Sequence, residues 1–321
     1  MTHPIVTQLY EQMSLPVICS PMFIVSSPKL VIEQCKSGVI GSMPALNARP
    51  AELLDDWLAE INETLSDARQ QEPTRKIAPY AINQIIHASN DRLDHDMAMC
   101  EKHKVPMIIT SLRAPNEVVE QTHKWGGVVF HDVTTLRHAE KAIEAGVDGL
   151  ILVAAGAGGH AGTLSPFALL SEVRRIFKGP IALSGSITTG DGILAARAMG
   201  ADFAYIGTRF IASTEANADQ RYKQMIVDSA AKDVLYTPFF TGIPGNYLTP
   251  SIINAGLDPE NLKKEEMVGT NFGSTRVKPW KDIWGAGQGV GTIDSIESTA
   301  QIVATMQEEY AQARQRLQGQ L

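Results

Sequence analysis

The chain has 321 residues, of which 44% are hydrophobic, and it carries a formal net charge of -7 at pH 7. This length can bury one large core, with or without a small second domain. The acidic balance and the lack of a Lys/Arg cluster argue against nucleic acid or an anionic membrane as a partner.

Three scattered cysteines, Cys19, Cys35 and Cys100, form neither a C-x-x-C pair nor an even disulfide framework. This pattern suits a reducing compartment, so we expect a cytoplasmic protein. The N-terminal stretch lacks a basic segment followed by an apolar one, and no signal peptide is expected. No apolar run approaches the roughly 18–20 residues that a membrane span needs, so a membrane segment is not expected either.

Short apolar runs rich in β-forming residues alternate with helical patterns along most of the chain. The runs are continuous, as expected of parallel strands that are covered on both faces. They lie at residues 16–21, 39–45, 77–83, 105–111, 127–133, 149–155, 181–186 and 203–210.

Helical patterns fill the intervals and continue beyond the last strand. Three of them stop at a glycine just past the last apolar position, namely Gly38, Gly146 and Gly200, which is a common C-terminal cap. The expected helices cover residues 27–38, 50–70, 91–104, 115–125, 135–146, 165–177, 191–200, 214–233 and 298–317.

Eight strands separated by helices predict an α/β fold, a (β/α)8 TIM barrel, built from residues 1–212 and 281–321. A doubly wound open sheet is the alternative, because eight βα units do not exclude it. Residues 213–280 include a stretch rich in Pro, Gly and Asn. We expect them to form a smaller inserted cap or lid domain over the barrel mouth.

The loops after the seventh and eighth strands predict an anion site. The seventh strand ends at Ser184 and continues with Gly185 and Ser186, and the eighth is followed by Gly207 and Thr208. Small residues let backbone N–H groups approach an anion, and hydroxyl groups add donors. Because these two loops frequently hold a phosphate in barrels, we expect a phosphate group here. The alternative is that the glycines only make tight turns.

The stretch "GAGGHAG" at residues 156–162 fits a loose dinucleotide pattern. A Rossmann turn is nevertheless rejected, because the helix starts only after "TLSP" and the next strand ends in Ser. We expect Gly158 and Gly159 to let the backbone pass close to a flat ligand and His160 to enter the pocket. An imidazole with a pKa of about 6.5 suits proton abstraction near neutrality. The alternative is a histidine on a surface loop.

Two further polar residues are candidates for the pocket. His131 ends the fifth strand and is placed to line the pocket, although a structural histidine is an equal alternative. Gln288, in the second glycine-rich loop "WGAGQGVG", can reach back to the ligand unless that loop is a plain linker. The motifs of zinc peptidases, P-loop proteins and serine hydrolases are missing, and no metal site is expected.

Four stretches, "GAGGHAG", "ALSGSITTGDGILAARAMGAD", "AYIGTRFIAS" and "WGAGQG", resemble nitronate monooxygenases. The likeness runs from about "PVICSPM" to the end of the chain. The wider superfamily also contains flavin-dependent NAD(P)H:quinone reductases and the flavin type of enoyl-acyl carrier protein reductase.

The resemblance implies a TIM barrel that binds FMN without a covalent link. Pro21, Met22 and Phe23 would offer backbone groups to the isoalloxazine, and Asn83 would hydrogen-bond near the polar edge of the ring. The phosphate would lie on the two loops described above, with Gln288 approaching the flavin.

Two positions depart from the family pattern that the resemblance implies. Several relatives have Lys at the end of the fifth strand, where this chain has His131. The usual double glycine after the seventh strand is Gly185–Ser186 here, which keeps the backbone N–H and adds a hydroxyl.

The implied reaction is the oxidation of alkyl nitronates, or of nitroalkanes, by O2 to carbonyl compounds and nitrite. His160 matches the catalytic histidine of the family and would act as general base or as nitronate binder. The alternatives are NAD(P)H:quinone or enoyl reduction on the same barrel, and a flavin-free phosphosugar isomerase or aldolase, for which no Lys is convincingly placed. The apolar stretch "YTPFFTGIPGNYL" could face substrate or the partner subunit of a homodimer.

Overall fold

The structure, a computed structural model, describes residues 3–262 and 283–319. Its main sheet has one strand at each of the eight positions that the sequence predicts. The strands are β1 (Val17–Cys19), β2 (Gly41–Pro44), β3 (Tyr80–Ile86), β4 (Met107–Leu112), β5 (Val128–Val133), β6 (Gly149–Val153), β8 (Ile181–Ser184) and β9 (Phe203–Ile206).

The main sheet closes on itself as a barrel. Its strand order is β1-β9-β8-β6-β5-β4-β3-β2, and neighbouring strands are parallel. A parallel bridge between Ile18 and Ile40 joins β1 to the residue that precedes β2. The predicted (β/α)8 barrel is therefore confirmed, and the open sheet is excluded because the first and last strands meet.

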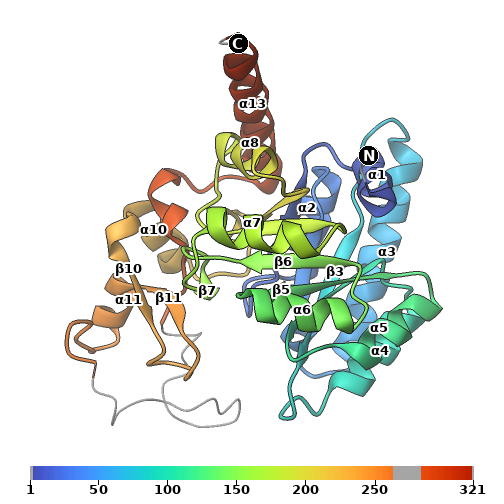
Figure 1. The fold of residues 1–321 in the computed structure, drawn as a ribbon, viewed down its shortest axis with the longest axis horizontal. Helices are drawn as coiled ribbons and strands as arrows, with labels where there is room; N and C mark the ends of the chain where they lie inside the picture. Colours follow the sequence, from blue (N-terminus) through green and yellow to red (C-terminus); the bar gives the residue numbers. More distant parts are fainter. Residues whose placement is uncertain (1–2, 263–282, 320–321) are drawn as a thin grey trace.

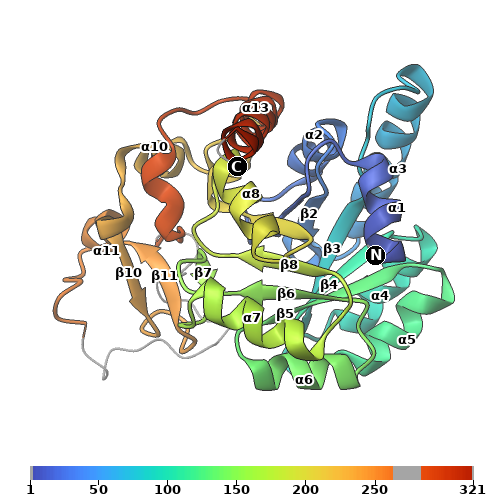
Figure 2. The same ribbon diagram turned by 45° about the horizontal axis from the view of Figure 1, so that its top comes forward.

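Helices surround the barrel on its outside (Figures 1 and 2). The positive φ angles of Gly38 (83°), Gly146 (81°) and Gly200 (106°) confirm the three predicted glycine caps. The surrounding helices are α2 (Pro28–Lys36), α3 (Leu53–Gln71), α4 (Leu93–Lys102), α5 (Asn116–Lys124), α6 (Leu136–Glu144), α7 (Pro166–Ile176), α8 (Gly190–Ala198) and α13 (Thr299–Gln318). Short 3-10 turns occur at Ala45–Asn47, Ala231–Asp233 and Gln288–Thr292.

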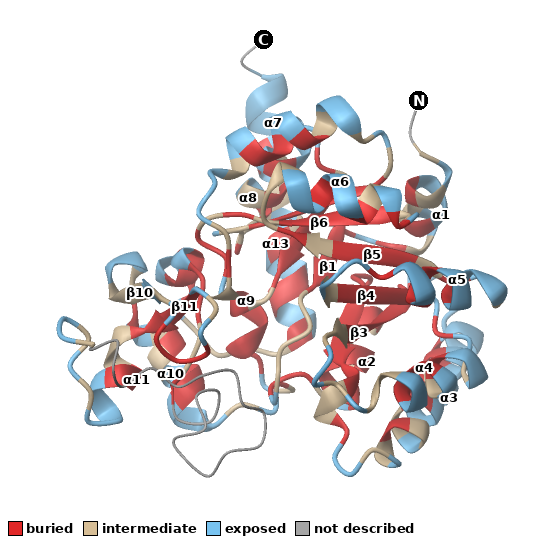
Figure 3. Ribbon diagram, turned by 60° about the horizontal axis from the view of Figure 1, so that its bottom comes forward, coloured by how far each residue is buried: buried red, intermediate tan, exposed pale blue. Residues whose placement is uncertain are grey.

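Successive residues of each strand face opposite sides of the barrel wall. Ile109, Phe130 and Phe203 belong to the cluster that fills the barrel interior. Ile108 and Val129, their neighbours in sequence, pack instead in the larger cluster between the sheet and the helices. Figure 3 shows the result as buried strands inside helices whose outer faces are exposed.

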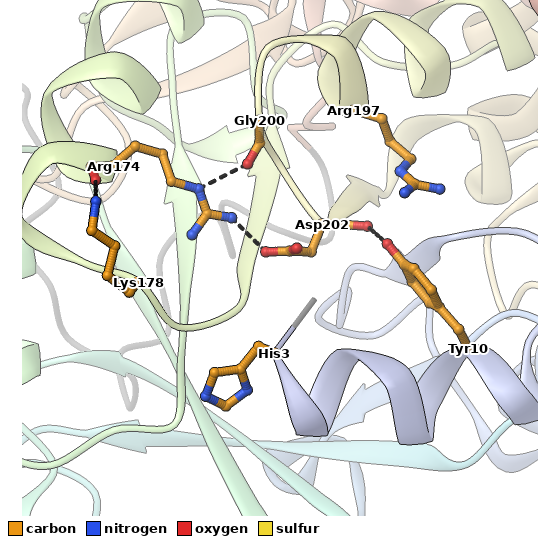
Figure 4. Close-up of a pocket in the computed structure, with 7 residues that line it drawn as sticks. All are labelled: His3, Tyr10, Arg174, Lys178, Arg197, Gly200 and Asp202. Carbon is orange, nitrogen blue, oxygen red and sulfur yellow. Dashed lines mark hydrogen bonds and ion pairs between the residues drawn. The ribbon is translucent and has the colours of Figure 1, made fainter. Parts of the chain in front are cut away.

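The N-terminal helix α1 (Pro4–Gln12), which the sequence pattern did not predict, covers the amino-terminal end of the barrel. Val6 and Leu9 are buried against the interior cluster, and the Tyr10 hydroxyl donates to the Asp202 carbonyl at 2.5 Å. Arg174 forms an ion pair with Asp202 beside a cavity of about 410 Å³ (Figure 4). The Arg174 guanidinium also donates to the carbonyls of Gly179 and Gly200, so it connects loops at the amino-terminal end of the barrel.

The chain after β9 builds a lobe at the carboxyl-terminal end of the barrel strands (Figure 1). The lobe has a three-stranded antiparallel sheet in the order β10-β11-β7. Its elements are α9 (Thr208–Ile211), α10 (Gln220–Asp228), β10 (Val234–Thr237), β11 (Gly245–Leu248), α11 (Thr249–Asn254) and, from the loop after β6, β7 (Gly159–His160).

The helix predicted over residues 214–233 is wrong in extent. The helix begins at Gln220, because the Asp219 side chain accepts from the Arg221 N–H at 2.8 Å and caps it there. Before it, Glu215 bonds the hydroxyl of Thr299 at the start of α13. The division into domains at 212/213 and 280/281 remains a prediction, and its second boundary lies outside the described residues.

Candidate active site

His160 lies at the edge of the sheet of the lobe. Gly159 and His160 form β7 and pair antiparallel with Asn246 and Gly245 of β11. The Asn246 side-chain amide also donates to the Ala157 carbonyl at 2.7 Å. This pairing could not be predicted from the sequence, because a strand of two residues has no periodicity. The lobe therefore fixes the backbone of the loop that carries the histidine.

The imidazole of His160 is held by a side chain of the lobe. Its Nε2 lies 2.9 Å from the Oγ1 of Thr241, whose hydroxyl also lies 3.0 Å from the carbonyl of Ile243. Burial disfavours the charged ring and lowers the pKa of His160 to about 4. The ring is therefore neutral at pH 7, which is the form that can accept a proton.

Four loops from distant parts of the sequence meet next to this histidine. The Gly156 carbonyl accepts from the N–H of Ser186 at 3.3 Å and from the N–H of Gln288 at 2.9 Å. The Oγ1 of Thr208 accepts from the N–H of Gly287 at 2.9 Å. The loops after β6, β8 and β9 and the loop before α13 thus form one surface, which contains most of the predicted phosphate-binding residues.

Glycine is required at several points where these loops touch. A Cβ at Gly158 would lie 2.8 Å from the Gly287 nitrogen and 3.2 Å from the Thr208 Oγ1. After Ser184, the backbone takes positive φ angles at Gly185 (125°) and at Ser186 (56°). Serine rarely adopts this conformation, and consecutive turns of this kind can aim backbone N–H groups at an anion.

The loop after β1 adjoins the same surface. A Cβ at Gly207 would lie 3.7 Å from the sulfur of Met22. The Asn47 amide donates to the Met22 carbonyl at 3.0 Å and fixes the segment 21–23, which contains Pro21 and Phe23. The centroid of the Phe23 ring lies 5.1 Å from the guanidinium carbon of Arg49, and both residues line a cavity of about 420 Å³.

A row of polar side chains crosses the carboxyl-terminal end of the barrel interior. The Asn83 amide donates to the Ser111 hydroxyl at 3.0 Å, and that hydroxyl donates to the Oδ2 of Asp132 at 2.6 Å. Burial raises the pKa of Asp132 to about 7. Sequence reasoning found Asn83 but missed Ser111 and Asp132, although the period of two along β5 puts Asp132 on the same face as the interior Phe130.

His131, which was predicted to line the pocket, faces the other way. It is buried between the helix-facing residues Val129 and Val133, and its Nδ1 lies 2.8 Å from the Oγ1 of Thr110. Burial lowers the pKa of His131 to about 4. His131 therefore lies on the helix-facing side of β5, which favours the structural alternative over a place in the pocket, because adjacent residues of a strand point to opposite faces.

Within residues 3–262 and 283–319, no three His, Cys, Asp or Glu side chains gather to hold a metal ion. In the same ranges, no helix combines the length and the apolar character that crossing a membrane requires.

The chain is similar to known proteins over most of its length. A family model described as "Nitronate monooxygenase" matches residues 7–309. A nitronate monooxygenase of Paraburkholderia phytofirmans is 28% identical over 280 residues, covering 77% of this chain and 76% of that protein.

Two further proteins are similar to the chain. The (3aS,4S,5R,7aS)-5-hydroxy-7a-methyl-1-oxo-octahydro-1H-indene-4-carboxyl-CoA dehydrogenase of Rhodococcus jostii is 24% identical over 75% of this chain and 64% of its own length. The solved structure of a nitroalkane oxidase from Streptomyces ansochromogenes has a TM-score of 0.78 at 21% identity, covering 97% of this chain and 99% of that one. This last likeness concerns the fold.

Proposed function

The chain belongs to the nitronate monooxygenase family and is an oxidoreductase, and we propose that it uses FMN to oxidise alkyl nitronates with O2. The products would be a carbonyl compound and nitrite. The observation that carries the proposal is the convergence of the His160 loop with the two small-residue loops after β8 and β9.

The residues at the barrel mouth fit a flavin with a phosphate group. The Thr208 Oγ1 already accepts from Gly287, and no described residue accepts its hydroxyl proton, which can therefore go to a phosphate oxygen. Gly185 and Ser186 supply the left-handed turn beside it. In the barrel interior, the Oδ1 of Asp132 is buried without a partner among the described residues, as expected of an atom that a ligand completes.

The remaining family positions would contact the ring. The segment Pro21–Phe23 would offer backbone groups, and the Asn83 amide and Gln288 would reach it from the interior and from the loop before α13. When bound, FMN supplies the redox chemistry between the organic substrate and O2. Gly158 and Gly159 would let the backbone approach the ring.

His160 would act on the substrate as a neutral imidazole. It can accept the proton that a nitroalkane loses from carbon, or donate a hydrogen bond to the anionic nitro group of a nitronate. With a pKa of about 4, the ring holds an accepted proton weakly. We therefore expect nitronates, which are already deprotonated, to be better substrates than neutral nitroalkanes.

The test is anaerobic mixing of the purified yellow protein with propyl nitronate. We expect the flavin absorption to bleach, and nitrite to form with turnover once O2 is admitted. A protein that carries no flavin chromophore contradicts the proposal, as does one whose flavin a nitronate cannot reduce.

A second candidate is dehydrogenation or reduction of a thioester or related carbonyl compound. It is favoured by the similarity to the carboxyl-CoA dehydrogenase of Rhodococcus jostii. The same anaerobic experiment with NADH, NADPH and an enoyl thioester separates the two. Bleaching by a pyridine nucleotide, with no response to propyl nitronate, would favour this second function.

A further inference from the structure

Asp132 is a carboxyl group in the barrel interior that the proposed chemistry of His160 does not use. It lies on β5 two residues after Phe130, which packs inside the barrel. Ser111, on the neighbouring strand β4, donates to its Oδ2 at 2.6 Å, and Asn83, on β3, donates to Ser111 at 3.0 Å. Three adjacent strands therefore form a chain of hydrogen bonds whose donors all point toward Asp132.

This chain of hydrogen bonds stops at an unsatisfied atom. The Oδ1 of Asp132 is out of contact with solvent and has no partner among the described residues, although part of the residue remains accessible. A buried polar atom without a partner is costly, so such an atom in a ligand site usually meets the ligand. The flavin proposed for the mouth is the group that can reach it.

The surroundings favour a neutral carboxyl. No Lys, Arg or His among the described residues forms an ion pair with Asp132. The titratable group facing it across the barrel is Tyr205 of β9, a buried phenol whose own pKa is raised well above its usual value. Burial acts in the same sense on the carboxyl and raises its pKa to about 7.

We propose that Asp132 binds the flavin as a neutral acid, with a proton on Oδ1 that it donates to an acceptor atom of the ring. This inference rests on the proposed flavin site. Because Oδ2 already accepts from Ser111, Oδ1 is the oxygen that carries the proton. The direction of donation then runs without a break from Asn83 through Ser111 and Asp132 to the ligand.

The exchange of Asp132 for Asn separates a neutral donor from a carboxylate. An Asn side chain can accept from Ser111 with its oxygen and donate to the ring with its NH2 group, so it reproduces the neutral acid. An Ala side chain can do neither. Ser111→Ala removes the support of Asp132, and Thr110→Val is its matched control, because Thr110 is adjacent on β4 but bonds His131 on the helix-facing side.

The experiment measures the Kd of FMN for the apoprotein of each variant by quenching of flavin fluorescence. We expect Asp132→Asn to stay within about twofold of the wild type and Asp132→Ala to bind about tenfold more weakly. Ser111→Ala should bind more weakly than Thr110→Val. The infrared spectrum should contain the carbonyl stretch of a protonated carboxylic acid at pH values below 7, and this band should be absent from Asp132→Asn.

Each other outcome overturns the inference. Equal weakening in Asp132→Asn and Asp132→Ala would mean that the site needs a carboxylate. Unchanged affinity in both would mean that Asp132 does not touch the ring. Thermal melting of each apoprotein identifies a variant that has lost its fold. In that case the carbonyl stretch of a protonated carboxylic acid in the wild type decides whether Asp132 is neutral. If the wild type binds no flavin, the proposed function is overturned as well. Equal weakening in both variants, or unchanged affinity in both, overturns only the role of Asp132 and leaves the proposed function standing.

Discussion

The Nε2 of His160 and the Oγ1 of Thr241 lie 2.9 Å apart, which joins the loop after β6 to the turn between β10 and β11. The two residues are 81 positions apart in the sequence. The histidine expected to do the chemistry is therefore oriented by a residue that the barrel does not contain.

His160→Asn should retain FMN and lose about 100-fold in kcat with nitroethane, because the amide cannot accept the proton from carbon. The loss with ethyl nitronate should be smaller, since that substrate needs no deprotonation. The flavin content is read from the visible spectrum, and the rates from nitrite formation. Equal losses on both substrates would remove the general-base role.

Thr241→Val should lower kcat about tenfold, because the imidazole loses the hydrogen bond to Thr241 that orients it. Thr241→Ser keeps the hydroxyl and should restore most of the activity. An acceptor at Nε2 stabilises the protonated ring, so the acid limb of the pH–rate profile of Thr241→Val should move to lower pH. A profile that keeps its shape while the rate falls would indicate a purely structural effect.

Thr208→Val should weaken FMN binding about tenfold and leave riboflavin binding unchanged. The reason is that only FMN has the phosphate toward which the Thr208 hydroxyl proton is free to point. Fluorescence quenching with both ligands on the same apoprotein is the measurement. A parallel loss for both ligands would place Thr208 at the ring or in the support of the loop.

His131→Asn should make the apoprotein less sensitive to acid without affecting FMN affinity. The pKa of His131 is about 4 in the folded chain, against about 6.5 for an exposed histidine. Between these values the unfolded chain binds the proton and the folded chain does not, so stability falls as the pH drops through this window. The free energy of unfolding, measured in urea, should change less between pH 7 and pH 5 in the variant than in the wild type. Identical changes in both proteins would contradict the prediction.

The sequence predicts the barrel strands well because their signal is strong and local. Runs such as residues 149–155 are continuous and apolar, and that pattern has few interpretations when helices separate the runs. The same continuity hides which face of a strand lies inside. The period of two puts Asp132 on the face of Phe130, but only the closed barrel shows that this face is the inner one, so the sequence singled out His131 and not Asp132.

The lobe and the N-terminal helix are predicted poorly, for a different reason. β11 has the sequence "GNYL", and β7 is two residues long, so neither has a hydrophobic pattern that would predict a strand before the two segments pair. They exist as strands because the barrel brings them together. The helix α1 carries its apolar residues Val6 and Leu9 for the barrel interior, a contact that sequence spacing cannot reveal.

Because β7 is a strand of the sheet built by β10 and β11, the lobe cannot be exchanged independently of His160, the proposed catalytic residue. A chimera that takes residues 234–248 from a relative with another specificity would also replace Thr241 and the strand β11, which together hold the loop and the imidazole of His160. A change of substrate range in such a scaffold therefore has to keep the pairing of β7 with β11. We expect the side chains of the lobe to diverge more readily than the path of its backbone.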